Sequence, residues 1–360
     1  MSTLHKPDAP EPVISIIVPS RNEGKSLERL LRSLAAQRDP GVSWEAIVAD
    51  GGSNAGSETL SSTTFMKEYP WLTVIPNPKG IVSTGLNLAV QAARGQVIIR
   101  MDVHTEYSHD YVANSYNALL TTRADNIGGP WVAVGSGYLG RAIAAAFQST
   151  FMAGGARSRC LDYEGPVDTV YLGCWRRQIF EECGLFDETL VRNQDDEFNL
   201  RLNRAGKVVW QTPRIRSRYH ARSHIGHLCS QYFQYGFWKT AVIRKHNTAA
   251  AVRHLLPSCF VLCNMILLLG SLAATLLGNR EAASLVFKGW VGQALIYAVA
   301  CLAAGVCVAS RTSWFLMPLL PIVFAVFHVA YGSGFLVGAI SPPNLEERPD
   351  PTSVFNKLSR

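Results

Sequence analysis

The sequence predicts an α/β domain with a mostly parallel sheet, followed by a C-terminal transmembrane helical region. Three observations support this fold class. Short apolar runs alternate with helical patterns over about the first 250 residues, polar clusters follow several of these runs, and charged residues almost vanish further on. Because alternating strands and helices are joined by right-handed crossovers, neighbouring strands are expected to be parallel.

The first element is an apolar run at residues 13–18, which is typical of a strand buried on both faces of a sheet. Leucines at helical spacing then predict a helix over residues 26–37. The remaining elements predicted before residue 105 are strands over 45–49, 72–75 and 96–101, and helices after residue 54 and over 85–93.

Polar clusters follow three of these strands, at Ser20–Glu23, Asp50–Asn54 and Asp102–His104. Ligands of parallel α/β sheets bind beyond the carboxyl ends of the strands. The three clusters are therefore expected to converge on one site. In an extended strand, residues i and i+2 point the same way, so Asp102 and His104 are placed to share a divalent ion. The alternative is a strand-end aspartate that caps the following turn.

Three stretches near the C-terminus contain no charged residue, namely 255–279, 289–310 and 312–345. Each is long enough to cross a hydrocarbon layer of roughly 30 Å, which needs about 20 residues. The alternative, buried helices of a large soluble core, is less compatible with three such stretches in succession. The last stretch contains Pro318 and Pro321, and is either one kinked span or an interfacial segment followed by a span.

The net charge of +7 indicates a membrane-facing surface and gives no reason to expect a nucleic-acid partner. Four basic residues lie just before the first apolar stretch: Lys239, Arg244, Lys245 and Arg253. Under the positive-inside rule they place the preceding domain in the cytoplasm. Residues 142–152 and 225–245 are predicted helices that could lie on a bilayer, because the second combines aromatic with basic side chains.

The remaining features exclude other classes of protein. The polar segment 1–12 is not a signal peptide, and no phosphate-binding loop with a Gly-Lys-Ser/Thr ending is present. The eight cysteines form no C-x-x-C pair, which argues against structural zinc and agrees with reduced thiols in the cytoplasm.

Four sequence blocks, at residues 15–23, 50–53, 101–104 and 193–201, together resemble inverting glycosyltransferases of family 2, which have the nucleotide-sugar-binding GT-A fold. The resemblance runs from about residue 13 to 245. Further blocks at 168–173, 184–188 and 231–236 are similar to membrane-anchored exopolysaccharide glucosyltransferases of the succinoglycan type. Composition and resemblance together predict five regions: a disordered N-terminal tail (1–12), a GT-A catalytic domain (13–222), interfacial amphipathic helices (223–253), about three transmembrane helices (254–345) and a polar C-terminal tail (346–360).

The resemblance implies a nucleotide-sugar site formed by Pro19, Arg21, Glu23, Asp50, Gly52, Lys79, Asn87, Met101 and Asp102. Glu23 and Asp50 would accept hydrogen bonds from uracil or ribose; the alternative is turn-forming or helix-capping carboxylates. Asn54 stands where the family often has a second aspartate. For Lys79 and Asn87, surface and helix-packing roles are equal alternatives.

The metal site implied by the resemblance consists of Asp102 and His104, completed by His220, and would hold Mn²⁺ or Mg²⁺. The family usually has a second aspartate where His104 stands. A packing or interfacial histidine is the alternative for His220.

Asp195 is the expected general base, because the Glu-Asp pair of the family appears here as Gln194-Asp195. The alternative is an acid-rich start of a helix over 197–205, which the helix macrodipole favours. An acceptor site is expected at Gly173, Trp175, Arg176 and Asp196, with an ordinary core tryptophan as the alternative for Trp175.

The resemblance as a whole implies a metal-dependent, inverting transferase with UDP-glucose as donor and a polyprenyl-diphosphate-linked saccharide as acceptor, acting in surface polysaccharide biosynthesis. It would be a multi-pass protein of the bacterial inner membrane with a cytoplasmic catalytic domain. The Gln-x-x-Arg-Trp motif of processive synthases is absent at residues 231–235, which favours a single addition. The alternatives are a polyprenyl-phosphate sugar synthase and a catalytically inactive, nucleotide-binding membrane scaffold.

Overall fold

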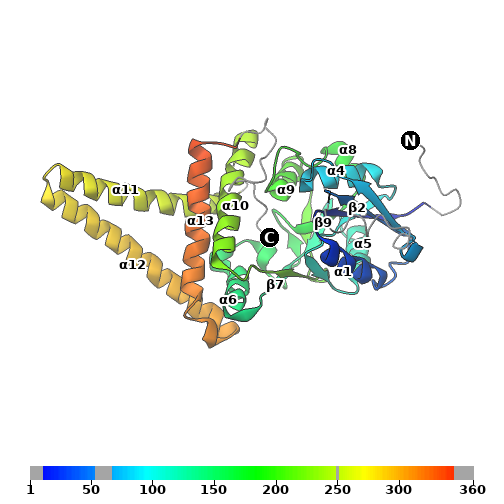
Figure 1. Ribbon diagram of the computed structural model, residues 1–360, viewed down its shortest axis with the longest axis horizontal. Coiled ribbons are helices and arrows are strands. Elements are labelled where there is room, and N and C mark those ends of the chain that lie inside the picture. Colours follow the sequence, from blue (N-terminus) through cyan, green and yellow to red (C-terminus); the bar gives the residue numbers. More distant parts are fainter. Residues whose placement is uncertain (1–10, 53–66, 249–250, 344–360) are drawn as a thin grey trace. The chain divides into compact units, whose positions relative to one another are not determined.

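A computed structural model describes residues 11–52, 67–248 and 251–343 (Figure 1). It confirms the predicted fold class: a mixed α/β domain with a mostly parallel sheet, followed by three long apolar helices. The predicted helix after residue 54 lies outside the described residues.

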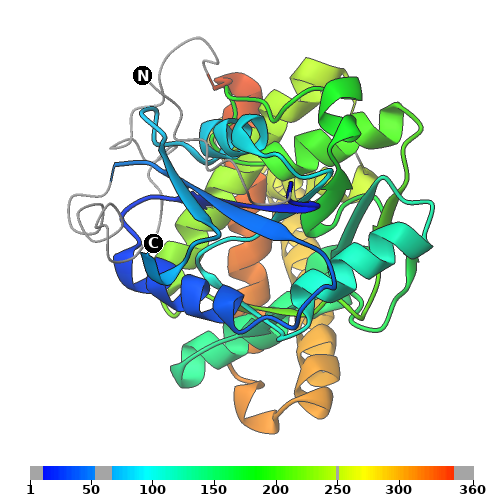
Figure 2. The same ribbon diagram turned by 90° about the vertical axis from the view of Figure 1, so that its right-hand side faces the viewer.

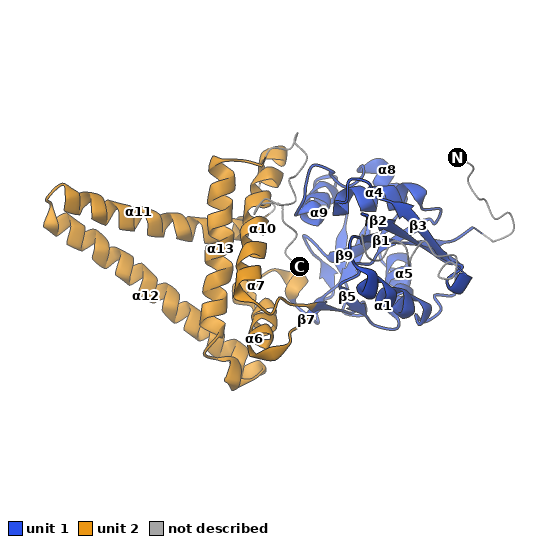
Figure 3. Ribbon diagram, viewed as in Figure 1, with its two compact units in different colours: residues 1–132, 160–219 blue, residues 133–159, 220–360 orange. Residues whose placement is uncertain are grey.

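The chain divides into two compact units (Figure 3). Unit 1 comprises residues up to 132 together with 160–219, and unit 2 comprises residues 133–159 and those from 220 onward. The segment 133–159, predicted within a continuous domain over 13–222, therefore groups with the C-terminal helices. The reason is aromatic packing within unit 2, where Phe147 contacts Phe327 and Phe151 contacts Phe324.

The main sheet of unit 1 has eight strands in the order β3-β2-β1-β4-β9-β6-β10-β8. Strands β3, β2, β1 and β4 are parallel to one another, whereas β9 runs antiparallel to both β4 and β6. Their bounds are β1 Ile14–Ser20, β2 Trp44–Asp50, β3 Leu72–Pro76, β4 Val97–Arg100, β6 Asn126–Gly129, β8 Gly165–Pro166, β9 Tyr171–Arg176 and β10 Val209–Gln211. A second sheet has the order β5-β11-β7, formed by β5 Thr105–Tyr107, β11 Ser217–His220 and β7 Trp131–Val134.

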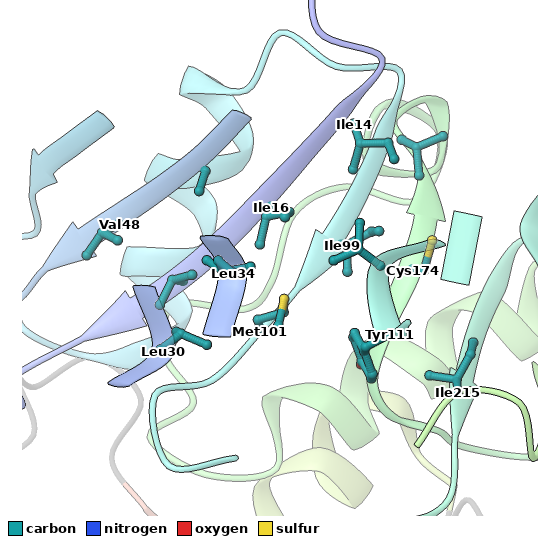
Figure 4. Packing of buried hydrophobic residues seen from close by; sticks show 14 of the residues in the cluster. Ile14, Ile16, Leu30, Leu34, Val48, Ile99, Met101, Tyr111, Cys174 and Ile215 are labelled. Carbon is teal, nitrogen blue, oxygen red and sulfur yellow. The ribbon is translucent and has the colours of Figure 1, made fainter. Parts of the chain in front are cut away.

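Helices cover both faces of the main sheet (Figures 1 and 2). They are α1 Gly24–Ala35, α4 Val82–Ala92, α5 Tyr111–Thr121, α8 Gln178–Glu182 and α9 Gln194–Arg204. The strand period of two decides which core a side chain enters. In β1, Ile14 and Ile16 pack with α1 and α5 in one core, which Figure 4 shows, whereas Ile17 packs with α4, α8 and α9 in the other.

The predicted strands at 13–18, 45–49, 72–75 and 96–101 are confirmed with shifted ends. The largest consequence is at β4, which ends at Arg100 and is followed by a turn over residues 101–104. Asp102 and His104 therefore do not lie in an extended strand, and the expectation that they share one face of it is wrong. The predicted helix over 85–93 begins earlier, at Val82.

Unit 2 contains the helices α6 Gly137–Phe147, α7 Thr150–Ala153, α10 Ile225–His246, α11 Leu256–Leu276, α12 Arg280–Arg311 and α13 Leu320–Ile340. Three segments of the described chain are long and apolar enough to cross a membrane: Val252–Leu276, Arg280–Arg311 and Leu320–Ile340. Pro321 lies in the first turn of α13, where a helix has no intrahelical hydrogen bond to lose. Pro321 therefore need not kink this helix.

Gly129 in β6 is required by close packing. A Cβ atom at this position would lie 1.7 Å from the carbonyl oxygen of Ile215. Gly129→Ala is expected to lower the free energy of unfolding by about 1–3 kcal/mol, because backbone must shift to admit a methyl group. Thermal unfolding of the detergent-purified chain measures this. Gly226→Ala is the control, since nothing lies within 4 Å of its added Cβ; an equal loss in both variants would contradict the packing argument.

Candidate active site

The ends of β1, β2 and β4 bring the predicted polar clusters to one edge of the sheet. Ser20 and Asp50 are directly paired in the parallel register of β1 and β2, and Gly51 N–H donates to the Ser20 carbonyl at 2.8 Å. On the other side of β1, Met101 N–H donates to the Ile17 carbonyl at 3.0 Å. The described parts of these clusters therefore converge as predicted, whereas Ser53 and Asn54 lie outside the described residues.

Arg21 connects the loops after β2 and β3. Its Nη1 donates to the Gly80 carbonyl at 3.1 Å. A Cβ on Gly51 would lie 3.1 Å from the Arg21 side chain, so the bare glycine lets this side chain pack against the backbone. Gly52 has a φ of +81°, which glycine adopts without steric cost. These contacts hold the Arg21 side chain against Gly80 and against Gly51, which directly follows Asp50 in the chain.

Lys79 and Asn87 contact the segment around Glu188. Lys79 forms an exposed ion pair with Glu188 at 2.7 Å. The buried Asn87 amide donates to the Phe186 carbonyl at 2.8 Å, and its oxygen accepts from the Phe186 N–H at 2.9 Å. In this structure Lys79 therefore has a surface role and Asn87 a helix-packing role, which are the alternatives expected for them.

Arg100 is the central cation of the edge, although the sequence did not single it out. Its side chain is only 3% exposed, and its Nε and Nη2 donate to both oxygens of Asp102 at 2.9 and 3.0 Å. Its Nη1 pairs with Oδ1 of Asp195. One guanidinium thus joins the carboxylate after β4 to the carboxylate in the first turn of α9. A lone charge at the end of the apolar run 97–99 is the signal that could have revealed it.

The charges of this network determine its protonation. Burial alone would lower the pKa of Arg100, but Asp102 and Asp195 raise it further than burial lowers it, so the guanidinium stays charged. Burial raises the pKa of Asp195, which Arg100 opposes and the neighbouring Asp102 and Asp196 reinforce. The net shift is upward, while 34% of the Asp195 side chain remains exposed. A carboxylate with a raised pKa and access to solvent is suited to accept a proton.

Tyr107 supports the turn that carries Asp102. The Asp102 N–H donates to the Tyr107 hydroxyl oxygen at 2.5 Å, and this hydroxyl donates to the Asp102 carbonyl at 3.0 Å. Burial, with a further contribution from Asp102, raises the pKa of Tyr107 well above its ordinary value. The phenol therefore keeps its proton and the turn keeps both bonds.

His104 contacts Glu23 instead of Asp102. Its Nε2 lies 2.8 Å from Oε1 of Glu23, whose side chain is 6% exposed, while His104 is 52% exposed. His220, at the end of β11, falls in unit 2. Within residues 11–52, 67–248 and 251–343, no group of three His, Cys, Asp or Glu side chains is arranged to hold a metal ion.

The first turn of α9 contains three acids with different surroundings. Glu197 is fully buried and pairs with Arg201 at 2.8 Å, and Arg201 also donates to the Leu185 carbonyl at 2.7 Å. This pair fastens α9 to the neighbouring loop. Asp195 instead faces Arg100, and its carbonyl accepts from the Asn199 amide at 3.0 Å. The structure therefore separates a fully buried packing acid, Glu197, from a partly exposed acid beside Arg100, Asp195.

The expected acceptor residues are divided between core and surface. Trp175 is 1% exposed and packs against Phe180, Phe186 and Phe198, so the alternative of a core tryptophan describes it. Gly173 has a φ of +133°, and a Cβ there would lie 2.3 Å from the Trp175 ring. Arg176 is exposed and donates to the Leu119 carbonyl at 3.1 Å.

Comparison with known proteins identifies related sequences. Residues 15–184 match the family model described as glycosyl transferase family 2. The succinoglycan biosynthesis protein ExoA of Rhizobium meliloti is 29% identical over 322 residues, which cover 89% of this chain and 93% of that protein. A dolichyl N-acetyl-alpha-D-glucosaminyl phosphate 3-beta-D-2,3-diacetamido-2,3-dideoxy-beta-D-glucuronosyltransferase of Methanococcus voltae is 25% identical, covering 64% of this chain and 74% of its own.

Among solved structures, a mannosyltransferase of Pyrobaculum calidifontis in complex with GDP-Man and Mn²⁺ is similar with a TM-score of 0.52. The two chains are 16% identical, with 89% of this chain and 87% of that chain covered. At this level of identity the similarity shows a shared fold.

Removing the Arg100 charge tests the network. Arg100→Met is expected to destabilise the chain by about 3–5 kcal/mol at pH 7, because it leaves Asp102 and Asp195 without their cation. The unpaired carboxylates would bind protons more readily in the folded chain, so the loss should shrink as the pH falls. Thermal unfolding between pH 5 and 8 measures both effects.

Arg32→Met is the matched control, because Arg32 forms an exposed pair with Glu28. Its effect should stay below about 1 kcal/mol at every pH. A loss in Arg100→Met that is equally small would show that the network contributes little to stability.

Proposed function

We propose that this chain transfers glucose from UDP-glucose to a polyprenyl-diphosphate-linked saccharide in surface polysaccharide assembly. The proposal starts from the match of residues 15–184 to glycosyl transferase family 2. The chain is a glycosyltransferase of polysaccharide or lipid-linked sugar biosynthesis. The donor sugar, the acceptor, the metal requirement and the inner-membrane location with a cytoplasmic catalytic domain are the proposed parts.

The observation that carries the proposal is the link through Arg100 between two carboxylates of different elements. Asp102 follows β4 at the carboxyl edge, where parallel α/β sheets bind their ligands. Asp195 begins α9 and is held to the same guanidinium. Asp102, proposed to lie on the donor side, and Asp195, the candidate base, are thus held by the same buried guanidinium.

In the proposed reaction, Asp195 accepts the proton of the acceptor hydroxyl. The hydroxyl oxygen attacks C1 of the donor sugar opposite the leaving group, forming the glycosidic bond while the bond from C1 to the diphosphate breaks. A single displacement inverts the anomeric centre. The raised pKa of Asp195 favours this role, because proton transfer is most effective when the pKa of the base approaches the working pH.

The nucleotide is proposed to bind along the edge formed by Arg21, Glu23 and Asp50. Asp50 ends β2 beside Ser20, and Arg21 packs across the loops after β2 and β3. Carboxylates suit the N–H of a base and the hydroxyls of ribose, whereas a guanidinium suits phosphate. UDP as the nucleotide and glucose as the sugar come from the resemblance to exopolysaccharide glucosyltransferases. A transfer assay with different UDP- and GDP-sugars tests both.

A divalent metal fits this edge with Asp102 as its protein ligand. The Asp102 side chain is 26% exposed, and each of its oxygens keeps a lone pair beyond the bond to Arg100. Mg²⁺ is commonly held by one or two carboxylates together with substrate phosphates and water, so a three-residue cage is unnecessary. Such a metal would stabilise charge on the departing diphosphate. His104 serves as a ligand only if it exchanges its contact with Glu23.

Two alternatives remain for the proposed role. A polyprenyl-phosphate sugar synthase would use the same donor site with the bare lipid phosphate as acceptor. An inactive nucleotide-binding scaffold would bind the donor without transfer. The intact Arg100 network, with a partly exposed Asp195 carboxylate, argues against it.

Asp195→Asn tests the base. Detergent-purified protein is supplied with UDP- and GDP-sugars, Mn²⁺ and a lipid-linked saccharide extract or a polyprenyl phosphate, and sugar incorporation is measured. The variant is expected to lose transfer by about 10²–10⁴-fold, because an amide cannot accept the proton. Asp39→Asn is the control, since Asp39 caps an exposed turn through the Gly41 N–H.

Each outcome of this assay assigns one part of the proposal. Transfer from UDP-glucose to the saccharide extract supports the full proposal, whereas transfer to polyprenyl phosphate alone selects the synthase. Donor binding without transfer by the wild type selects the scaffold. Retained transfer in Asp195→Asn, with loss in Asp196→Asn, would make Asp196 the base.

Metal removal tests Asp102. Treatment with EDTA is expected to abolish transfer and added Mn²⁺ to restore it. In Asp102→Asn the Mn²⁺ concentration for half-maximal rate should rise by at least about tenfold. His104→Ala should shift it less, because its ring contacts Glu23. Undiminished transfer in EDTA would contradict the metal requirement.

A further inference from the structure

We propose that only α11 and α12 cross the membrane, as a hairpin, while α13 lies along the membrane surface together with α10. All three helices are long and apolar enough to span, but their surroundings within unit 2 differ. The consequence is an even number of crossings, which puts the C-terminus on the same side as the catalytic domain. This inference is independent of the proposed donor and acceptor.

Helix α13 is packed against α10 over most of its length. Glycines let the two backbones approach closely at three points. Gly236 of α10 lies against the Tyr331 carbonyl. Gly334 and Gly338 of α13 lie against the carbonyls of Phe233 and Phe237. Further along, Arg244 Nη2 donates to the Ala339 carbonyl at 2.6 Å. Both helices run in the same direction, as Figure 1 shows, and behave as one pair.

The partner helix α10 is unsuited to hydrocarbon. Near its middle it carries the buried Gln231, Gln234 and Lys239, and its last turn holds Arg244, Lys245 and His246. If α13 crossed the bilayer along its axis, α10 would be carried into the apolar layer beside it. Polar and charged groups at that depth are costly. At a membrane surface the exposed Arg244 and Lys245 of the last turn can reach water and lipid headgroups.

The hairpin of α11 and α12, in contrast to α10, is suited to hydrocarbon. In the most apolar part of α11 no residue is buried inside the protein, compared with 39% in α13. The side chains of Ile266, Leu269 and Leu276 are each more than half exposed. With 21 residues, α11 is about 32 Å long, which matches a hydrocarbon layer of roughly 30 Å. A large exposed apolar surface marks an interaction site, and on a helix whose length matches the hydrocarbon layer it favours contact with lipid.

The direction of the hairpin completes the argument. Within unit 2, α11 and α12 project away from α13 instead of running beside it (Figure 3). One flat bilayer therefore cannot be crossed by the hairpin and by α13 along their own axes. The hairpin is the better candidate, because α11 is not covered by protein whereas α13 is paired with α10. Lys288 is the only charge between Glu281 and Arg311, and its aliphatic stem allows the ammonium to reach the headgroups.

Charges at the two ends of the hairpin indicate its orientation. Arg253 precedes α11 and Arg311 ends α12 at the base, whereas Arg280 and Glu281 offset each other at the tip. Glu281 is also the only acidic residue in the described part of unit 2. An excess of positive charge at the base places it on the cytoplasmic side.

Reporter fusions to the full chain test this topology. Green fluorescent protein, which fluoresces only in the cytoplasm, and alkaline phosphatase, which is active only outside it, are each placed before Met1, inside the turn at Gly278 and after Arg360. Each location then gives a positive signal from one reporter. We expect fluorescence at both termini and phosphatase activity at the Gly278 turn.

Two results would overturn the inference. Phosphatase activity after Arg360 would mean that α13 crosses as a third span. Fluorescence at the Gly278 turn would mean that the hairpin does not cross. Wild-type levels of sugar transfer by the terminal fusions show that the reporters leave the chain folded, and loss of transfer from an otherwise inserted chain bears on the proposed function alone.

Discussion

The ion network around Arg100 is the interaction on which the site depends. A guanidinium that is 3% exposed must be compensated. Of the two carboxylates that compensate it, Asp102 is a near neighbour in the chain, whereas Asp195 lies 95 residues after Arg100. Desolvation makes each partner dependent on the others, because an uncompensated buried charge costs several kcal/mol. The network therefore positions α9 against the end of β4 and keeps Asp195 beside a fixed positive charge.

This constraint explains why the neighbouring residues are arranged as they are. Tyr107 holds the backbone of Asp102 through two hydrogen bonds, so the carboxylate meets Arg100 from a rigid turn. The Glu197–Arg201 pair and the Asn199 amide fix the first turn of α9 from the other side. The roles proposed for Asp102 and Asp195 need such support, since small errors in position are costly for a reaction. The aromatic core around Trp175 packs against β4 and α9 and supports both elements.

The apolar C-terminal helices follow a different constraint. Their position depends on where polar groups of the backbone and side chains can find hydrogen-bond partners or water. Composition alone makes α11, α12 and α13 equivalent candidates for crossing a membrane. Packing distinguishes them, because α13 is combined with the polar helix α10 and with the aromatic side chains of α6 and α7. The segment 133–159 thus belongs to the same unit as the tail, although it lies within the sequence of the catalytic domain.

Periodicity and hydropathy are local properties of the chain, so they were enough to predict the parallel strands β1, β2 and β4 and the three apolar helices. The sequence also identified Asp102 and Asp195, since both lie in recognisable blocks. Three features became apparent only in the folded chain: Arg100 joins these two carboxylates, His104 contacts Glu23, and Trp175 lies in the core. These outcomes depend on contacts between distant segments and on the exact end of β4, where a turn replaces the strand alternation that the pattern predicts.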